Sequence, residues 1–145
     1  MSYPENIYDA VEQLETEMTS VLAALPTLQA AVSDSGWKTL PLSQGIEAYA
    51  TTQIPQYRKI GKIVFIRGAV KGITATGTIA TLPAGYRPAA TMPFVQNTSQ
   101  RSGPFTMVAR YTINNAGAIN LESVSDGATL AADKWFPIAT SFTID

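Results

Sequence analysis

The sequence predicts a mainly β protein, with an antiparallel β-sandwich or jelly-roll-like head over residues 36–145 and an α-helical coiled coil over residues 1–35. Before Gly36, apolar residues recur at alternating steps of three and four. After Gly36, several short segments alternate apolar and polar residues, and glycine and proline separate them. Short strands with such breaks are typical of antiparallel sandwiches and barrels.

Residues 4–33 carry the pattern of a coiled-coil helix, and Pro4 followed by Glu5 is a reasonable helix start. The apolar residues occupy heptad positions a (Val11, Met18, Leu25, Val32) and d (Ile7, Leu14, Val21, Leu28) without a break. Exposed to water, these eight side chains would each favour association by roughly 1–2 kcal/mol. Their mixture of branched and unbranched types does not specify a dimer and accepts a trimer. The alternative is an amphipathic helix that packs on its own domain.

Pro26 lies inside this helix and does not shift its heptads. A proline within a helix removes one hydrogen bond and costs about 3 kcal/mol. We therefore expect a kink or short break near Leu25 and Pro26, and then a second short helix from Thr27 to about Ser33. Gly36, in the stretch SDSG, is a natural stop.

Charge divides the chain at the same place. Residues 1–36 carry six acidic residues and no Lys or Arg, whereas residues 37–145 carry ten basic and five acidic residues. The acids of the first part are Glu5, Asp9, Glu12, Glu15, Glu17 and Asp34. An acidic helical part and a basic β part are therefore expected to be structurally separate.

The second part divides into short β segments. In chain order we expect a short strand at 37–42, irregular β structure at 46–61 with a break at Pro55, a strong strand at 62–72, and strands at 74–82, 92–97, 104–113, 118–125 and 135–144. The stretch NNAG, residues 114–117, is a hairpin turn signal. The strand before it should place Phe105, Met107, Ala109, Tyr111 and Ile113 on one face, and Thr106, Val108, Arg110 and Thr112 on the other.

Some of these strands are apolar on both faces. Along 62–72 one face carries Val64, Ile66 and Val70, and the other carries Ile63, Phe65, Arg67 and Ala69. Along 135–144 the residues Phe136, Ile138, Thr140, Phe142 and Ile144 share one face. In a small sandwich the second face is normally in water, so an apolar second face suggests cover by a neighbouring subunit.

The composition argues against an enzyme. The chain has no cysteine and no histidine, which removes thiolates, the commonest general base and the commonest zinc ligand. The acids of the second part, Glu47, Glu122, Asp126, Asp133 and Asp145, are scattered among turns, so a catalytic carboxylate pair is disfavoured. We expect no catalytic residue, no cofactor and no metal.

Binding to nucleic acids or insertion into membranes is not expected either. No glycine-rich loop precedes a helix, and basic residues cluster only in YRKIGK, residues 57–62. No apolar run approaches the ~20 residues of a membrane span, and the start lacks the features of a signal peptide. Trp37 and Trp135 are expected to fill the core or an interface, with a sugar-stacking platform as the alternative.

The turn LPAGYRP, residues 82–88, places an aromatic and a cationic residue between a glycine and a proline. Two explanations remain open. In the first, Tyr86 caps the end of the sandwich while Arg87 pairs with a carbonyl or carboxylate group. In the second, the two side chains contact a ligand or a neighbouring subunit at the rim.

Three stretches carry a resemblance to a known family: YRKIGKIVFIRGAVKG (57–72), IATLPAGYRPAA (79–90) and YTINNAGAINLES (111–123). Together they resemble the head domain of receptor-binding tail proteins from phages of Gram-positive bacteria. The resemblance covers about residues 37–145, and the heptads match the helical shoulder that precedes such heads. It implies a homotrimer held by an N-terminal trimeric coiled coil, made in the host cytoplasm and located at the virion tail tip or baseplate.

The same resemblance implies that the head binds a cell-surface saccharide, often in clefts between subunits. In the lactococcal relatives the strand before the Asn-Gly hairpin carries a His and an Asp that face the sugar. Matched by the hairpin, those positions hold Arg110 and Thr112 here. We expect the ligand site there, with Gln96 and Asn97 as amide contacts, Trp135 as a stacking face, and Tyr86 and Arg87 as a second locus. We also expect the acidic coil to dock on a basic virion protein.

Two other functions remain open. The first is a structural baseplate or tail appendage subunit without carbohydrate affinity. The second is a tail-associated glycan hydrolase, which the missing histidines and the scattered acids disfavour.

Overall fold

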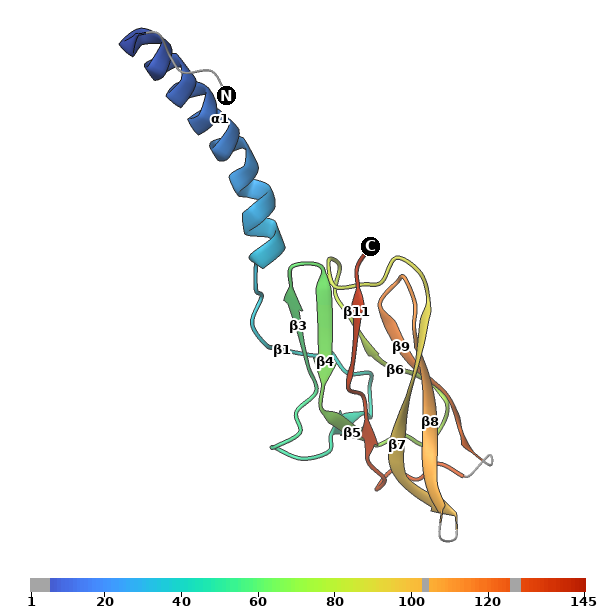
Figure 1. The fold of residues 1–145 in the computed structure, drawn as a ribbon. Helices are drawn as coiled ribbons and strands as arrows, with labels where there is room; N and C mark the ends of the chain where they lie inside the picture. The colour runs from blue at the N-terminus through green and yellow to red at the C-terminus, as the bar shows by residue number, and fades with distance from the viewer. Residues whose placement is uncertain (1–5, 103–104, 126–128) are drawn as a thin grey trace. The chain divides into compact units, whose positions relative to one another are not determined.

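The computed structural model describes residues 6–102, 105–125 and 129–145. The chain divides into two compact units, Met1–Ser33 and Asp34–Asp145. The first unit is helical and the second is built from β-strands (Figure 1). Within the described residues, no helix is long and apolar enough to cross a membrane.

The first unit contains one helix, α1, from Ile7 to Val32. Asn6 caps its start, because the Asn6 side-chain oxygen accepts hydrogen bonds from the backbone amides of Tyr8 and Asp9 at 2.9 and 3.1 Å. The predicted start at Pro4 and Glu5 lies outside the described residues. No residue of α1 is buried within the single chain, so none of its apolar side chains belongs to a core of its own.

The predicted second helix after Pro26 is wrong, because α1 continues through Pro26 to Val32 as one element. The fixed backbone φ angle of proline, near −65°, is itself a helical value, so Pro26 removes one backbone hydrogen bond without forcing the chain out of the helix. Regular turns on both sides carry the helix across this point. A local bend at Pro26 stays a prediction.

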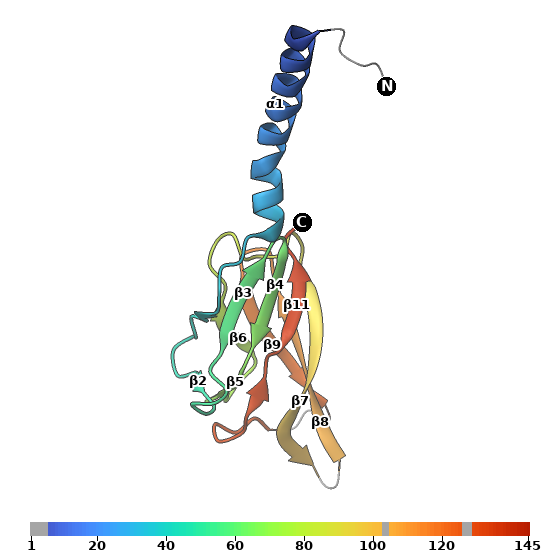
Figure 2. The ribbon, with the colours of Figure 1, turned by 60° about the vertical axis from the view of Figure 1, so that its left-hand side comes forward.

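The second unit is mainly β, as predicted, and its described strands form three antiparallel sheets (Figures 1 and 2). Sheet A has the order β1 (Lys38–Thr39), β3 (Gln56–Ile60), β4 (Ile63–Arg67), β11 (Thr140–Thr143). Sheet B has the order β6 (Gly77–Thr81), β9 (Ala118–Val124), β8 (Phe105–Ile113), β7 (Met92–Ser102). The smaller sheet C has the order β10 (Phe136–Pro137), β5 (Ala69–Lys71), β2 (Glu47–Ala48).

One hydrophobic core joins these sheets. Sheet A contributes Tyr57, Val64 and Ile66, sheet C contributes Val70 and Phe136, and sheet B contributes Ile79, Met107, Ala109, Tyr111, Ile113, Ile119 and Leu121. Buried and more exposed residues alternate along β4 and along the described part of β8, as a strand with one buried face requires. Each large sheet therefore keeps an outer face that the single chain leaves in water.

Gly68 divides the predicted strand 62–72 into β4 and β5, which belong to different sheets. Gly68 has a φ angle of 108°, and a Cβ atom there would lie 2.6 Å from the Ile54 carbonyl oxygen. This change of direction buries Ala69 next to Val70, so the predicted outward position of Ala69 is wrong. The predicted strand 135–144 is likewise two strands, β10 and β11.

The predicted hairpin around NNAG is confirmed, since β8 pairs with β9 across it. The Asn114 side-chain oxygen accepts hydrogen bonds from the amides of Ala116 and Ala118, both at 3.0 Å. The alternation along β8 is also confirmed: Met107, Ala109, Tyr111 and Ile113 are buried, and Val108 and Arg110 are exposed. The side chains of Phe105 and Thr106 lie outside the described residues.

The buried Tyr111 hydroxyl has no hydrogen-bond partner among the described residues. Its ring stacks on Phe94 with centroids 4.8 Å apart, and burial raises the pKa of the Tyr111 hydroxyl. Because an unsatisfied buried hydroxyl costs about 1–3 kcal/mol, Tyr111→Phe should raise the free energy of unfolding by about 1 kcal/mol. Urea denaturation of both forms measures this change, and a less stable Phe variant would show that the hydroxyl has a partner.

Candidate functional site

The outer face of sheet B carries three of the predicted site residues. Arg110 lies opposite Val95 of β7 and Ser123 of β9, and Thr112 lies opposite Pro93 and Asn120. Asn97 lies opposite Val108. Residues directly opposite each other on neighbouring strands share a face, so Arg110, Thr112 and Asn97 lie on one surface.

This surface combines a cation with apolar residues. Val95 is 56% exposed and Val108 is 37% exposed, and the Arg110 side chain beside them is exposed. Within the described residues, the ion pairs of the head do not include Arg110. The Thr112 hydroxyl, in contrast, donates a hydrogen bond to Glu122 Oε1.

Gln96 and Trp135 lie apart from this surface. Gln96 pairs with the buried Ala109 and therefore projects to the inner side of sheet B, where its Nε2 donates to the Ala139 carbonyl. The Trp135 amide donates to Ser99 Oγ at 2.8 Å. The Trp135 ring lies 6.1 Å from the Tyr49 ring. The structure thus does not bring Gln96 or Trp135 together with Arg110.

The turn with Tyr86 and Arg87 is a third location, and both side chains contact the head itself. The Tyr86 ring packs edge-on against Tyr57, with centroids 4.8 Å apart. Lys59 Nζ lies 4.9 Å above the Tyr86 ring and donates to the Gly85 carbonyl at 2.8 Å. Arg87 Nε donates to the Leu82 carbonyl at 2.9 Å. These contacts match the structural explanation of GYRP, and a role of this turn in ligand binding stays a prediction.

The outer side of sheet A holds a cation cluster that the sequence analysis missed. The Arg67 guanidinium carbon lies 3.9 Å from the centre of the Trp37 ring, and that of Arg58 lies 5.7 Å from it. Arg67 donates from both Nε and Nη2 to Gln56 Oε1, at 3.0 and 2.7 Å. Gln56 and Arg67 lie at the open end of the β3–β4 hairpin, where they face each other. The two residue types are visible in the sequence, but their pairing follows only from the register of the hairpin.

Asp34 binds Arg58 and begins the second unit. The Asp34 Oδ1 atom accepts hydrogen bonds from Arg58 Nε and the Gly36 amide, both at 2.8 Å. The Arg58 guanidinium, followed by the Gly36 amide, lowers the pKa of the Asp34 carboxyl from 3.8 to about 2. The ion pair therefore persists through mildly acidic pH.

An NMR titration of the Asp34 side chain should give this pKa of about 2. Because the pKa is lower in the folded chain than in the unfolded chain, the ion pair stabilises the fold above pH about 4, and this contribution is lost as the pH falls toward 2. Arg58→Gln should return the pKa toward 3.8. A wild-type pKa at or above the ordinary value would contradict the pairing.

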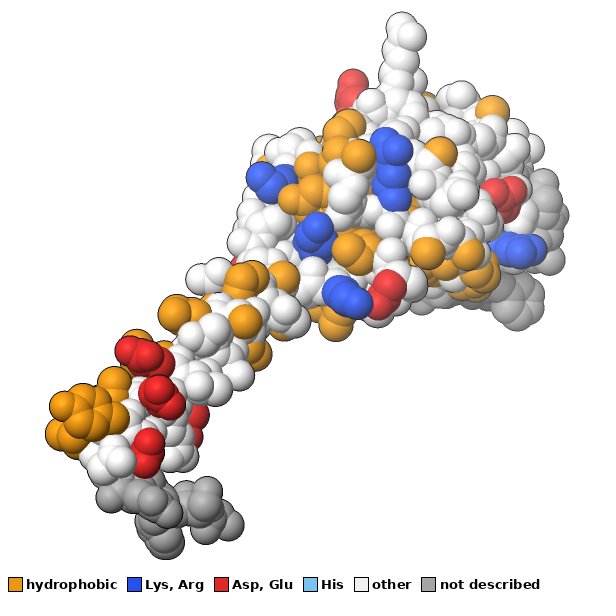
Figure 3. All heavy atoms as spheres, turned by 90° about the horizontal axis from the view of Figure 1, so that it is seen from above, with side chains coloured by type: hydrophobic (Ala, Val, Ile, Leu, Met, Phe, Trp, Pro, Cys, Tyr) orange, Lys and Arg blue, Asp and Glu red, His pale blue; other side chains and the backbone are white. Residues whose placement is uncertain are grey.

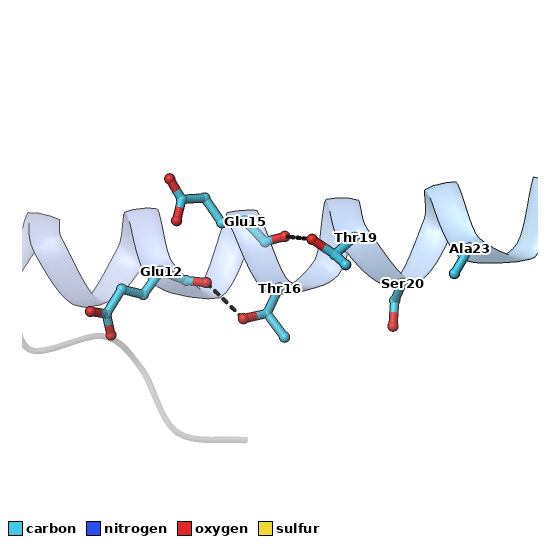
Figure 4. A pocket seen from close by; sticks show the side chains of 6 residues that line it. All are labelled: Glu12, Glu15, Thr16, Thr19, Ser20 and Ala23. Carbon is cyan, nitrogen blue, oxygen red and sulfur yellow. Dashed lines mark hydrogen bonds between the residues drawn. The ribbon is translucent and has the colours of Figure 1, made fainter.

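The polar side of α1 has a shallow hollow lined by Glu12, Glu15, Thr16, Thr19, Ser20 and Ala23 (Figure 4). The Thr16 and Thr19 hydroxyls donate to the carbonyls of Glu12 and Glu15 at 2.9 Å. All these residues lie on a single helix, so no second wall encloses a ligand. The acidic side chains gather in the N-terminal half of α1 (Figure 3), so this side of the helix carries a negative charge.

No protein-family model matches the sequence, and a search of curated proteins finds no match. The structure is similar to the receptor-binding protein gp15 of Listeria phage PSA, with a TM-score of 0.53 and 21% identity, over 95% of this chain and 80% of that one. It is also similar to the head domain of the lactococcal phage bIL170, with a TM-score of 0.51 and 14% identity, over 74% of this chain and 96% of that one. The chain has the fold of phage receptor-binding proteins. The resemblance to this group, predicted from the motifs at 57–72, 79–90 and 111–123, is confirmed at the level of structure.

Proposed function

We propose that this protein is the receptor-binding protein of a phage tail or baseplate, that it acts as a homotrimer, and that its head attaches the virion to a host cell-surface saccharide. The fold carries this proposal: the similarity to the Listeria phage protein extends over 95% of the chain. The lactococcal head domain, which matches over 74% of this chain, supports the same assignment.

The exposed apolar residues of α1 support the trimer. Every a and d side chain is at least 40% exposed in the single chain, and Ile7 and Val32 reach 74%. At about 25 cal/mol per Å² of apolar surface removed from water, burial of this stripe between chains is strongly favourable. A helix of this length with a proline is also marginal in water on its own. Association of three helices would bury the apolar stripe and would also stabilise the helix.

The head also exposes apolar pairs that a neighbouring subunit would cover. On sheet A, Ile60 and Ile63 face each other across the β3–β4 pair and are 38% and 42% exposed. On sheet B, Val95 and Val108 flank Arg110. In the proposed trimer the Arg110 surface borders a neighbouring head, and the saccharide binds near that border through Arg110.

The acidic half of α1 supports a contact with another virion protein. Asp9, Glu12, Glu15 and Glu17 precede any basic residue of the chain, and in the heptads Glu15 and Glu17 occupy e and g, where like charges face each other between chains. Each such repulsion is a few tenths of a kcal/mol and is screened by salt. A basic binding surface on another virion protein would neutralise these charges and so remove the repulsion. If the virion protein that contacts α1 has a neutral or acidic surface there, this part of the proposal is contradicted.

An array of cell-wall saccharides, probed with the purified full chain, tests the proposed activity. Saturable binding of one or more saccharides without turnover supports a receptor-binding protein. The absence of binding to every wall saccharide of a host that the virion infects would indicate a structural tail subunit. Release of soluble fragments from purified cell wall would indicate a hydrolase.

A further inference from the structure

A hollow with a mixed polar and apolar lining lies on the side of the head that bears sheet A. It has a volume of about 420 Å³ and is lined by residues 51–54, Gln56, Arg67 and Gly68. This volume falls in the range of roughly 300–1,000 Å³ that is usual for small-molecule sites. None of its lining residues is a carboxylate, so Arg67 gives the hollow a positive charge.

Three contacts hold the Arg67 guanidinium in place. Its carbon lies 3.9 Å from the centre of the Trp37 ring, which is a favourable cation–π geometry. Its Nε and Nη2 atoms both donate to Gln56 Oε1. One edge of the guanidinium fork is thus occupied by Gln56, and the second edge, formed by Nη1 and the remaining Nη2 proton, has no partner within the described part of the chain.

The same contact orients the Gln56 amide. Because Gln56 Oε1 accepts from Arg67, the Nε2 group of Gln56 remains as a donor at the hollow. Thr51, Thr52 and Gln53 add two hydroxyl groups and an amide on the opposite lining segment. The hollow therefore offers a fixed cation, several neutral hydrogen-bond donors and one exposed apolar side chain, Ile54.

The backbone around the hollow is held by specific contacts. The Gln53 amide donates to the Ala50 carbonyl, and the Ala69 amide donates to the Gln53 carbonyl, both at 3.0 Å. At Gly68 the chain passes so close to Ile54 and Pro55 that a Cβ atom would lie 2.6–2.7 Å from their backbone atoms. The loop between β2 and β3 is thus tied to the start of β5, and it presents its polar side chains in a defined place.

We propose that this hollow binds the phosphate group of a phosphorylated saccharide or polyol, as a second receptor subsite on the head. The free edge of the Arg67 fork matches two phosphate oxygens, and the donors of Gln56, Thr51 and Thr52 suit the remaining oxygens and the neighbouring hydroxyl groups. The subsite rests on the proposed function, and it is separate from the Arg110 surface, which belongs to sheet B. Single-site affinity is weak, and the repeated copies in a virion supply avidity.

Titration of the isotope-labelled full chain with sn-glycerol 3-phosphate, followed by NMR, tests this subsite. The amides of residues 51–56 and Gly68 and the Arg67 Nε signal should shift saturably, whereas glycerol at the same concentration and sodium chloride at the same ionic strength should leave them unchanged. Arg67→Gln should weaken this response at least fivefold, and Arg67→Lys, which keeps the charge but loses the fork, should weaken it less. Lys62→Gln, which removes an exposed cation that does not line the hollow, should leave it intact.

Two sets of outcomes separate the subsite from the proposed function. No shift at the hollow, an equal response to glycerol, or an unchanged response in a folded Arg67→Gln variant would overturn the subsite. If host cells still bind the wild-type chain in that case, the proposed function stands without it. If the hollow responds as described but the chain binds no host cell, the hollow remains a phosphate site, and its role as a receptor subsite fails together with the proposed function.

Discussion

Replacement of Leu14 and Val21 by glutamate should convert the protein from a trimer to a monomer. Both residues occupy d positions, and they are 58% and 61% exposed in the single chain. In a three-helix seam the double variant would bury six carboxylates, and each uncompensated buried charge costs several kcal/mol. The mass measured by light scattering should fall from three times 15.5 kDa to that of one chain, and the helical circular dichroism signal should decrease with it.

The matched control is Ala23→Glu together with Ala30→Glu. These residues lie at f positions of the same heptads and are exposed, so the control adds the same charge on the side away from the a and d stripe. It should remain a trimer. A wild-type chain that is monomeric at micromolar concentration, or a Leu14 and Val21 double variant that keeps the full mass, would contradict the coiled coil. Removal of residues 1–34 should weaken association more than it perturbs the head, because the core lies within the second unit and the head loses only the contacts of Asp34.

Arg110→Ala should abolish adhesion to host cells while lowering the melting temperature by no more than a few degrees. Arg110 is exposed on β8 and forms no ion pair within the described residues, so its removal leaves no buried group unpaired. Loss of a charge-assisted hydrogen bond costs each site about 1.5–3 kcal/mol, and the loss is multiplied over the three sites of a trimer and over the many trimers of a virion.

Lys62→Ala serves as the control for this variant. Lys62 is an exposed cation that pairs with Asp145 at 2.9 Å. It lies between β3 and β4 of sheet A, whereas β8 belongs to sheet B. The Lys62→Ala variant should adhere to host cells as strongly as the wild type does. If Arg110→Ala adheres normally, or if it unfolds, Arg110 has a structural role, and the principal saccharide site lies elsewhere on the head.

The parts of the fold that were predictable from the sequence depend on residues that are close together in the chain. The heptads from Ile7 to Val32 run along one helix, and the Asn114 turn closes its own hairpin through contacts within four residues. The division at Gly68 was not predictable in this way, because it depends on the approach of Ile54, fourteen positions earlier in the chain. Continuity through Pro26 was not predicted from the sequence: proline removes one hydrogen bond, but its φ angle is helical and the turns on both sides hold the helix together.

The candidate site was predictable only in part, for a related reason. Arg110, Thr112 and Asn97 share a face because the β7–β8 register aligns them. Gln96 is adjacent to Asn97 and must point to the other side of the sheet, so strand geometry alone separates the two. The Arg67 hollow needs the β3–β4 register, the Trp37 ring and the loop of residues 51–54 together, and no short sequence pattern brings these three segments into contact.

The central claim is that this chain attaches a virion to a bacterial surface. The most direct measurement is the binding of fluorescently labelled full-length protein to a panel of Gram-positive cells, with and without an excess of purified wall saccharide from the cells that bind. The account predicts saturable binding to a narrow set of strains, competition by their own wall saccharide, and loss of binding in Arg110→Ala. Binding to no strain of a host that the virion infects, or binding that no wall saccharide displaces, would contradict it.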